Sequence, residues 1–171
     1  RCFEDDNVVH VDGSIDPVRD KEIIDTELLL KDLDTVEKHV DKYQKAAKSA
    51  RKEDIISFET GKKLKTHLES GKAARSFIPD TDQAKKVVND MYLLTSKPVL
   101  YVLNVDESSV IEGNEHTKKF MDSLEEESEV ILISAGIEAD LVDFDDLEER
   151  QMFLEEMGLS EAGVNRVIRA S

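Results

Sequence analysis

Two runs of consecutive apolar residues constrain this fold more than any other feature of the sequence. The first run is Val99–Leu103, directly after Pro98, and the second is Val130–Ile133. Continuous rather than alternating apolarity is typical of strands covered on both faces, as in parallel α/β sheets. Residues 115–126 predict a helix between them, with an inward face of Phe120, Met121 and Leu124. This order implies a right-handed crossover, with both strands ending at the same edge of one sheet.

Polar residues follow each predicted strand and indicate a ligand site. Asn104, Val105 and Glu107 come after the first strand, and Ser134 and Ala135 come after the second. In open α/β sheets, ligands bind at the carboxyl ends of the strands. An Asn side chain has one donor group and one acceptor, so it can bind N7 and the exocyclic group of either purine. Backbone N–H groups at Ser134 and Ala135 would close the other side of a base.

The carboxylate of Glu107 bears on which purine the site would accept. Guanine presents N1–H and an N2 amine as donors, whereas the acceptor at N1 of adenine would repel a carboxylate. GTPases use Asn-Lys-x-Asp here, but this chain has Asn-Val-Asp-Glu, residues 104–107. Because Glu is one methylene longer than Asp, we expect no strong preference for GTP. An Asn-x-x-Glu series after a strand also arises by chance, so an ordinary loop is the alternative.

Residues 26–75 predict a helical hairpin inserted between the parts of the α/β domain, residues 1–25 and 76–171. The first helix carries apolar residues at alternating spacings of four and three, which is a heptad seam. The seam residues are Leu29, Leu33, Val36, Val40, Tyr43, Ala47 and Ala50. A second helix at about 53–71, with Ile56, Leu64 and Leu68, could return antiparallel to the first.

Charge is distributed unevenly along the chain. The net charge is −16, but residues 38–75 hold eleven Lys or Arg and five Asp or Glu. A local basic surface of this kind can face a polyanion. The candidate contacts for a polyanion such as RNA are Lys38, Lys42, Lys45, Lys52, Lys62, Lys63 and Lys65. An ordinary solvated helix surface is the alternative, and a steep dependence of RNA affinity on salt would distinguish the two.

Composition excludes several other classes of function. The single cysteine, Cys2, fits a reducing compartment, and no apolar stretch is long enough to span a membrane, so we expect the cytoplasm. The four histidines lack metal-ligand spacing, and Ser134 is not in a G-x-S-x-G elbow, so we expect neither a metal site nor a nucleophile. Near the C-terminus, residues 160–170 predict a packing helix capped by Ser160, with an inward face of Val164, Val167 and Ile168.

Three blocks of sequence, in their order around the predicted hairpin, resemble the YchF family, the Obg-like ATPases among the translation-factor-class P-loop GTPases. The blocks are RCFEDDNVVHVDGSIDPVRDKEIIDTELLLKDL, KPVLYVLNVDE and GVNRVIRA. The resemblance implies a G domain interrupted by a coiled coil and followed by a TGS domain. It also implies ATP, or GTP, with Mg as cofactors, and association with ribosomes or RNA. By resemblance, Asn104 and Glu107 fall on the base-reading motif, and Ser134 and Ala135 on the last nucleotide-binding loop.

Two family elements are missing from these residues. The sequence contains neither a G-x-x-x-x-G-K-[ST] loop, which holds phosphates, nor an Asp-x-x-Gly segment for magnesium. We therefore expect part of a P-loop NTPase sheet, without catalytic residues of its own and without tight nucleotide binding by itself. Residues 1–3 predict the end of a strand, and the inner edge of this strand would have no neighbouring strand to pair with. An open edge of this kind predicts self-association of the chain.

Overall fold

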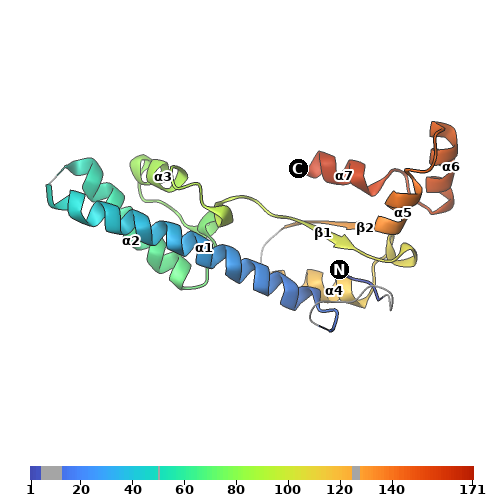
Figure 1. Ribbon diagram of the computed structural model, residues 1–171, viewed down its shortest axis with the longest axis horizontal. Coiled ribbons are helices and arrows are strands. Elements are labelled where there is room, and N and C mark those ends of the chain that lie inside the picture. The colour runs from blue at the N-terminus through green and yellow to red at the C-terminus, as the bar shows by residue number, and fades with distance from the viewer. Residues whose placement is uncertain (5–12, 50, 125–127) are drawn as a thin grey trace. The chain divides into compact units, whose positions relative to one another are not determined.

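The computed structural model describes residues 1–4, 13–49, 51–124 and 128–171 (Figure 1). The chain divides into two compact units, one formed by residues 1–21 with 99–171 and the other by residues 22–98. The second unit contains the whole segment that we predicted as a hairpin insertion. The exact bounds of that insertion, residues 26–75, stay a prediction.

The unit of residues 22–98 is built on a helical hairpin. It comprises most of α1 (Pro17–Ala46), then α2 (Lys52–Glu69) and α3 (Asp82–Asn89), with short 3-10 turns at Ala47–Ser49, Ala74–Ser76 and Leu94–Ser96. Lys65 Nζ lies 2.9 Å from Glu37 Oε1, and His39 Nε2 lies 3.2 Å from the carbonyl oxygen of Ser57. These pairs place later residues of α1 beside earlier residues of α2, so the helices run antiparallel as predicted.

The predicted seam forms the core of this unit. Val36, Leu64 and Leu68 are fully buried, and the partly buried seam residues Leu29, Leu33 and Val40 pack against the same cluster. Ala50, the last predicted seam position, lies outside the described residues. A heptad pattern therefore located this core correctly.

A buried carboxylate ties α1 to the segment that follows α3. Asp32 is 1% exposed, and its two oxygens accept hydrogen bonds of 2.7 Å from Leu94 N, Thr95 N and the Thr95 hydroxyl. The same hydroxyl oxygen accepts a 2.8 Å bond from Ala74 N. Buried charge is costly unless it is hydrogen-bonded, and here three donors offset that cost.

The other unit contains the predicted parallel pair of strands. β1 (Leu100–Asn104) pairs with β2 (Glu129–Ile133), in a register that sets Leu100 opposite Glu129 and Asn104 opposite Ile133. The helix α4 (Glu115–Asp122) lies between them in sequence, begun by a capping box at Asn114 and Thr117. After β2 come α5 (Ala135–Asp140), α6 (Leu147–Glu156) and α7 (Gly163–Ala170).

The core of this unit gathers residues from most of its elements. Its buried members are Cys2, Leu103, Val105, Val110, Phe120, Ile137, Leu141, Leu154 and Ala162. The parallel sheet and the helical hairpin together confirm the expected α/β fold with a helical insertion. Within the described residues, no helix is both long and apolar enough to span a membrane.

Several local predictions were wrong, among them an inward position for Met121 on α4, which is 40% exposed. Residues 1–4 are not in a strand, although Cys2 N donates a 2.8 Å hydrogen bond to the carbonyl oxygen of Asn104. The last helix is not capped by Ser160: it begins at Gly163, whose N–H donates to Glu138 Oε1 at 2.6 Å. Val164 and Ile168, which we expected inside, are 47% and 67% exposed.

Close contact at Gly163 explains the orientation of α7. A Cβ on Gly163 would lie 2.8 Å from Ile133 Cγ2, so the bare backbone lies close to β2 here. This approach turns the side of the helix that carries Gly163 and Val167 inward, away from the face predicted from apolar spacing. Self-association through an open edge of the sheet stays a prediction.

Candidate nucleotide-binding site

A hollow lies at the carboxyl edge of the two strands. Its volume is about 640 Å³, and its lining residues come from the chain start, from the segment after β1 and from the segment after β2. The ladder continues past the strands, because Val105 N donates to the carbonyl oxygen of Ile133 at 2.9 Å. The two segments therefore leave the sheet at the same level. The lining residues are Phe3, Glu4, Asn104, Val105, Asp106, Glu107, Ser108, Ser134, Ala135 and Gly136.

All five residues predicted for base recognition line this one hollow. Asn104 ends β1 and is half-buried, Val105 is buried, and Glu107 is exposed at the start of a 3-10 turn, Glu107–Ser109. Ser134 is buried at the start of α5, and Ala135 next to it is exposed. Strand order and register thus bring together residues that lie thirty positions apart in sequence.

The side chain of Asn104 is held in one orientation by the opposite segment. Its Oδ1 accepts a hydrogen bond of 3.0 Å from Ala135 N. The Nδ2 group of Asn104 has no hydrogen-bond partner within the described part of the chain. Its two N–H donors are therefore available to a ligand. An oriented amide donor beside a hollow can bind an acceptor such as N7 of a purine.

The two neighbouring carboxylates differ in their surroundings. Asp106 accepts hydrogen bonds from the hydroxyls of Ser108 at 2.5 Å and Ser109 at 3.0 Å, and the Ser108 bond is the main cause that lowers the Asp106 pKa. The side-chain carboxylate of Glu107 has no hydrogen bond or ion pair with any residue that the structure describes. Its Oε1 would lie only 3.1 Å from a Cβ built on Gly136. Asp106 therefore shapes the turn, while Glu107 remains available over Gly136.

Some lining residues were missed by sequence reasoning. Gly136 directly follows the predicted Ser134–Ala135 pair, and its lack of a side chain leaves room for the Glu107 carboxylate. Phe3 and Glu4 also line the hollow, about a hundred residues before β1. No local pattern signals such a long-range approach, because it depends on the backbone bond from Cys2 to Asn104.

The structure separates the seven candidate lysines into two groups. Lys38, Lys62, Lys63 and Lys65 form ion pairs with carboxylates of the same unit, among them Lys38 with Asp34 at 2.6 Å and Lys65 with Glu37 at 2.9 Å. For Lys42, Lys45 and Lys52, no ion pair with a described residue is present. These three lie near the turn between α1 and α2, as do Lys48 and Arg51. We call these five residues the basic tip.

No group of three or more His, Cys, Asp or Glu residues that could hold a metal ion occurs in the described part of the chain. Of the described histidines, His39 and His67 belong to the helical unit, and His116 lies on α4. His10 is outside the described residues.

Comparison with known proteins gives a consistent result. The chain is 44% identical to the ribosome-binding ATPase YchF of Bacillus subtilis, across all of the chain and 47% of that protein. It is 38% identical to YchF of Escherichia coli O157:H7 and 35% identical to Obg-like ATPase 1 of Gallus gallus, each across 99% of the chain. The chain is similar to the YchF and Obg-like ATPases over its whole length. A scan against models of protein families found no match.

The fold leads to the same relatives. The solved structure of the YchF GTPase of Schizosaccharomyces pombe superposes with a TM-score of 0.79 at 28% identity, covering 99% of this chain and 47% of that one. The partial P-loop NTPase fold that the resemblance implied is thereby confirmed. The chain spans less than half the length of the YchF relatives it matches.

Proposed function

We propose that these residues form the base-binding edge of a nucleotide-binding ATPase. The observation that carries the proposal is the hollow at the carboxyl edge of β1 and β2, where Ala135 N orients the Asn104 side chain. Ligands of open α/β sheets bind at this edge. Relatives named as ATPases cover the whole chain, which supports a nucleoside triphosphate as the ligand.

The chemistry of the hollow supports adenine at least as well as guanine. Asn104 Nδ2 would donate to N7, an acceptor that both purines share. Glu107 does not have to meet the Watson–Crick edge, because its carboxylate can lie over Gly136. The site then does not require the N1–H and N2 donors of guanine. ATP is accordingly the proposed ligand, alongside or in preference to GTP.

The complete gene product would bind this nucleotide together with Mg and hydrolyse it. Phosphate and magnesium would be held by groups that are not among these 171 residues, because the sequence contains no phosphate-binding G-x-x-x-x-G-K-[ST] loop. We assign no catalytic residue within the chain. The names of the relatives support a ribosome-associated, cytoplasmic protein as part of the same proposal.

Nucleotide selectivity tests the role of Glu107. We expect Glu107→Asp in the complete gene product to shift the ratio of GTP to ATP affinity towards GTP, measured by titration with fluorescent analogues of both. The shorter side chain restores the Asn-x-x-Asp series that reads guanine. Glu112→Asp, at another exposed site of the same unit, is the matched control. An unchanged ratio in Glu107→Asp would show that this carboxylate does not take part in base recognition.

The basic tip supports a second function, contact with RNA of the ribosome. Its cations Lys42, Lys45, Lys48, Arg51 and Lys52 form no ion pair with the described residues, in contrast to the lysines further along the hairpin. Cations that are not paired with carboxylates can replace counterions on phosphates, which makes binding steeply salt-dependent.

Two sets of substitutions distinguish this tip from the rest of the hairpin. We expect the triple change Lys42→Ala, Lys45→Ala and Lys52→Ala to weaken binding of ribosomal RNA and to reduce its salt dependence by about one unit of slope per lost phosphate contact. The control triple, Lys38→Ala, Lys62→Ala and Lys63→Ala, removes lysines that are already paired. Equal losses from both sets would refute a specific role for the tip.

A further inference from the structure

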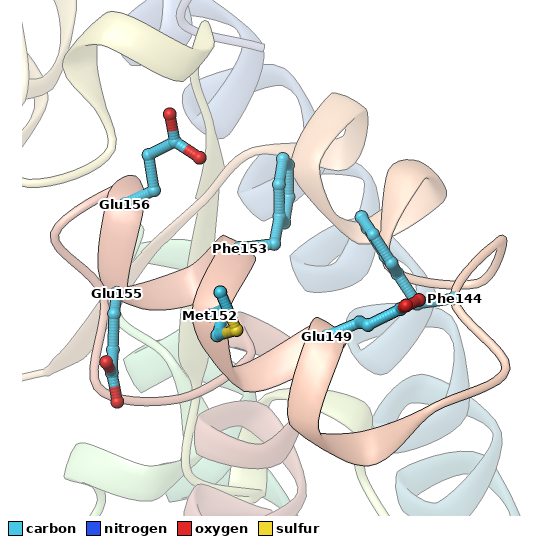
Figure 2. Close-up of a pocket in the computed structure, with 6 residues that line it drawn as sticks. All are labelled: Phe144, Glu149, Met152, Phe153, Glu155 and Glu156. Carbon is cyan, nitrogen blue, oxygen red and sulfur yellow. The ribbon is translucent and has the colours of Figure 1, made fainter.

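A second hollow lies on α6, and it is distinct from the hollow at the carboxyl edge of the two strands. Its volume is about 460 Å³, and none of its lining residues is shared with the first hollow. Figure 2 shows Phe144 and Glu149 at one end, Met152 and Phe153 in the middle, and Glu155 and Glu156 at the other end. We call this surface the α6 hollow.

One face of α6 supplies most of this surface. Glu149, Met152, Phe153 and Glu156 follow one another at spacings of three, one and three, so they share a face of the helix. Leu154, on the other side, is 4% exposed and packs into the core. Phe153 is half-buried and also packs against this core, whereas Glu149, Met152 and Glu156 on the same face are exposed.

The floor of the hollow is apolar. The rings of Phe144 and Phe153 lie with their centroids 5.2 Å apart, and Met152 beside them is 69% exposed. A methionine in such a position adapts its shape to different apolar partners, because its side chain is unbranched and polarisable. An exposed apolar surface rimmed by polar groups is typical of a protein interaction site.

The rim of the hollow is acidic. The carboxylates of Glu149 and Glu156 have no hydrogen bond or ion pair with the described residues, and the carboxylate of Glu155 accepts one bond, of 3.1 Å, from Gln151 Nε2. Residues 138–156 contain nine Asp or Glu and a single basic residue, Arg150. Of these nine, Glu149, Glu155 and Glu156 line the hollow, and no metal-binding group forms among the described residues. This field would repel nucleic acid and attract cationic protein segments.

We propose that the α6 hollow binds a basic amphipathic segment of a partner protein. Apolar side chains of the segment would enter between Phe144, Met152 and Phe153, while flanking Lys or Arg would pair with Glu149, Glu155 and Glu156. Helices with one apolar and one charged face dock into apolar grooves in this way. The proposal is independent of the nucleotide site, and its test does not use nucleotide.

The test measures binding of a fluorescein-labelled Lys/Leu peptide, with Leu at the helical spacing of three and four, to the complete gene product. We expect saturable binding by fluorescence anisotropy. Two related peptides serve as controls, one with Glu in place of Lys and one with Ser in place of Leu, and neither should bind. Binding of the Ser peptide as tightly as the Leu peptide would mean attraction by charge alone and would overturn the proposal.

Variants of the protein locate the binding surface. The double reversal Glu149→Lys and Glu156→Lys should weaken peptide binding by about tenfold or more, since two attractions become repulsions. Met152→Ser should weaken it without changing net charge. The matched control is Glu112→Lys with Glu129→Lys, two exposed carboxylates of the same unit outside the hollow. Equal effects of the two double reversals, or no peptide binding at all, would overturn the proposal.

Sedimentation of the same proteins tests a different occupant, the basic tip of a second copy. We expect Glu149→Lys with Glu156→Lys to leave the sedimentation coefficient unchanged. If the unaltered protein self-associates and this double reversal abolishes the association, the occupant is a second copy and the proposed partner segment is wrong.

Discussion

Asp32 offers the sharpest prediction about what holds the helical unit together. Its carboxylate is 1% exposed and accepts three hydrogen bonds of 2.7 Å, from Leu94 N, Thr95 N and the Thr95 hydroxyl. Asp32→Ala removes the acceptor for all three donors. A buried donor left without a partner costs about 1–3 kcal/mol. Leu94 is half exposed, so its amide can bond water, whereas Thr95 is buried.

The expected loss for Asp32→Ala is therefore about 3–5 kcal/mol in the free energy of unfolding. With a urea slope near 2 kcal/mol per molar, the unfolding midpoint would fall by about 2 M. Far-ultraviolet circular dichroism follows the transition, and hydrogen exchange of peptides from residues 22–98 assigns it to this unit. Asp32→Asn keeps one acceptor oxygen and should lose about half as much.

Asp34→Ala is the matched control for this experiment. Asp34 lies two positions further along α1, and its partner Lys38 is exposed. An exposed pair of this kind contributes about 0–1 kcal/mol, so the midpoint should hardly move. The reasoning is refuted if Asp32→Ala unfolds within about 0.5 kcal/mol of the unaltered protein, a change typical of ordinary surface substitutions.

Three further predictions concern other packed positions. Gly163→Ala should destabilise the unit of the two strands by about 1–3 kcal/mol in urea unfolding, because the new Cβ would lie 2.8 Å from Ile133 Cγ2; an unchanged midpoint would contradict the close packing. Burial lowers the pKa of His39, so the unfolded chain binds more protons and stability should fall as pH drops below about 6.5. This pH dependence should shrink in His39→Gln, and an equal dependence in both proteins would refute it. Burial raises the pKa of the Cys2 thiol, which should react with a thiol reagent near neutral pH only slowly until urea exposes it; rapid reaction of the folded protein would show that Cys2 is accessible.

Much of this fold follows from short-range patterns in the sequence. Continuous apolar runs located both strands to within about one residue. The coverage on both faces that such a run predicts is not complete, because Val102 in the middle of β1 is 39% exposed. The heptad spacing located Val36 at the centre of the hairpin core. Parallel strand order then sufficed to bring Asn104 and Ser134 to the same edge, because a crossover leaves both strand ends there.

Other features depend on contacts between distant residues, and no local pattern reveals them. Asp32 lies beside the heptad seam and reads as a surface acid, but its hydrogen-bond donors are more than sixty residues further on. The apolar spacing of the last helix predicted the wrong inward face, because Gly163 sets the approach to β2 without a side chain. The sequence also did not show which lysines form ion pairs, because a partner can lie beyond the hairpin, as Asp80 does for Lys63.

The affinity of the complete gene product for fluorescent ATP, compared between Asn104→Ala and Asn89→Ala, tests the central claim most directly. Asn89 is an exposed residue at the end of α3, so its change controls for the loss of an Asn side chain. We predict that Asn104→Ala weakens binding by about 1–3 kcal/mol, roughly 5- to 150-fold, while Asn89→Ala leaves it unchanged. Equal ATP affinity for Asn104→Ala and the unaltered protein would contradict the assignment of the base to this edge of the sheet.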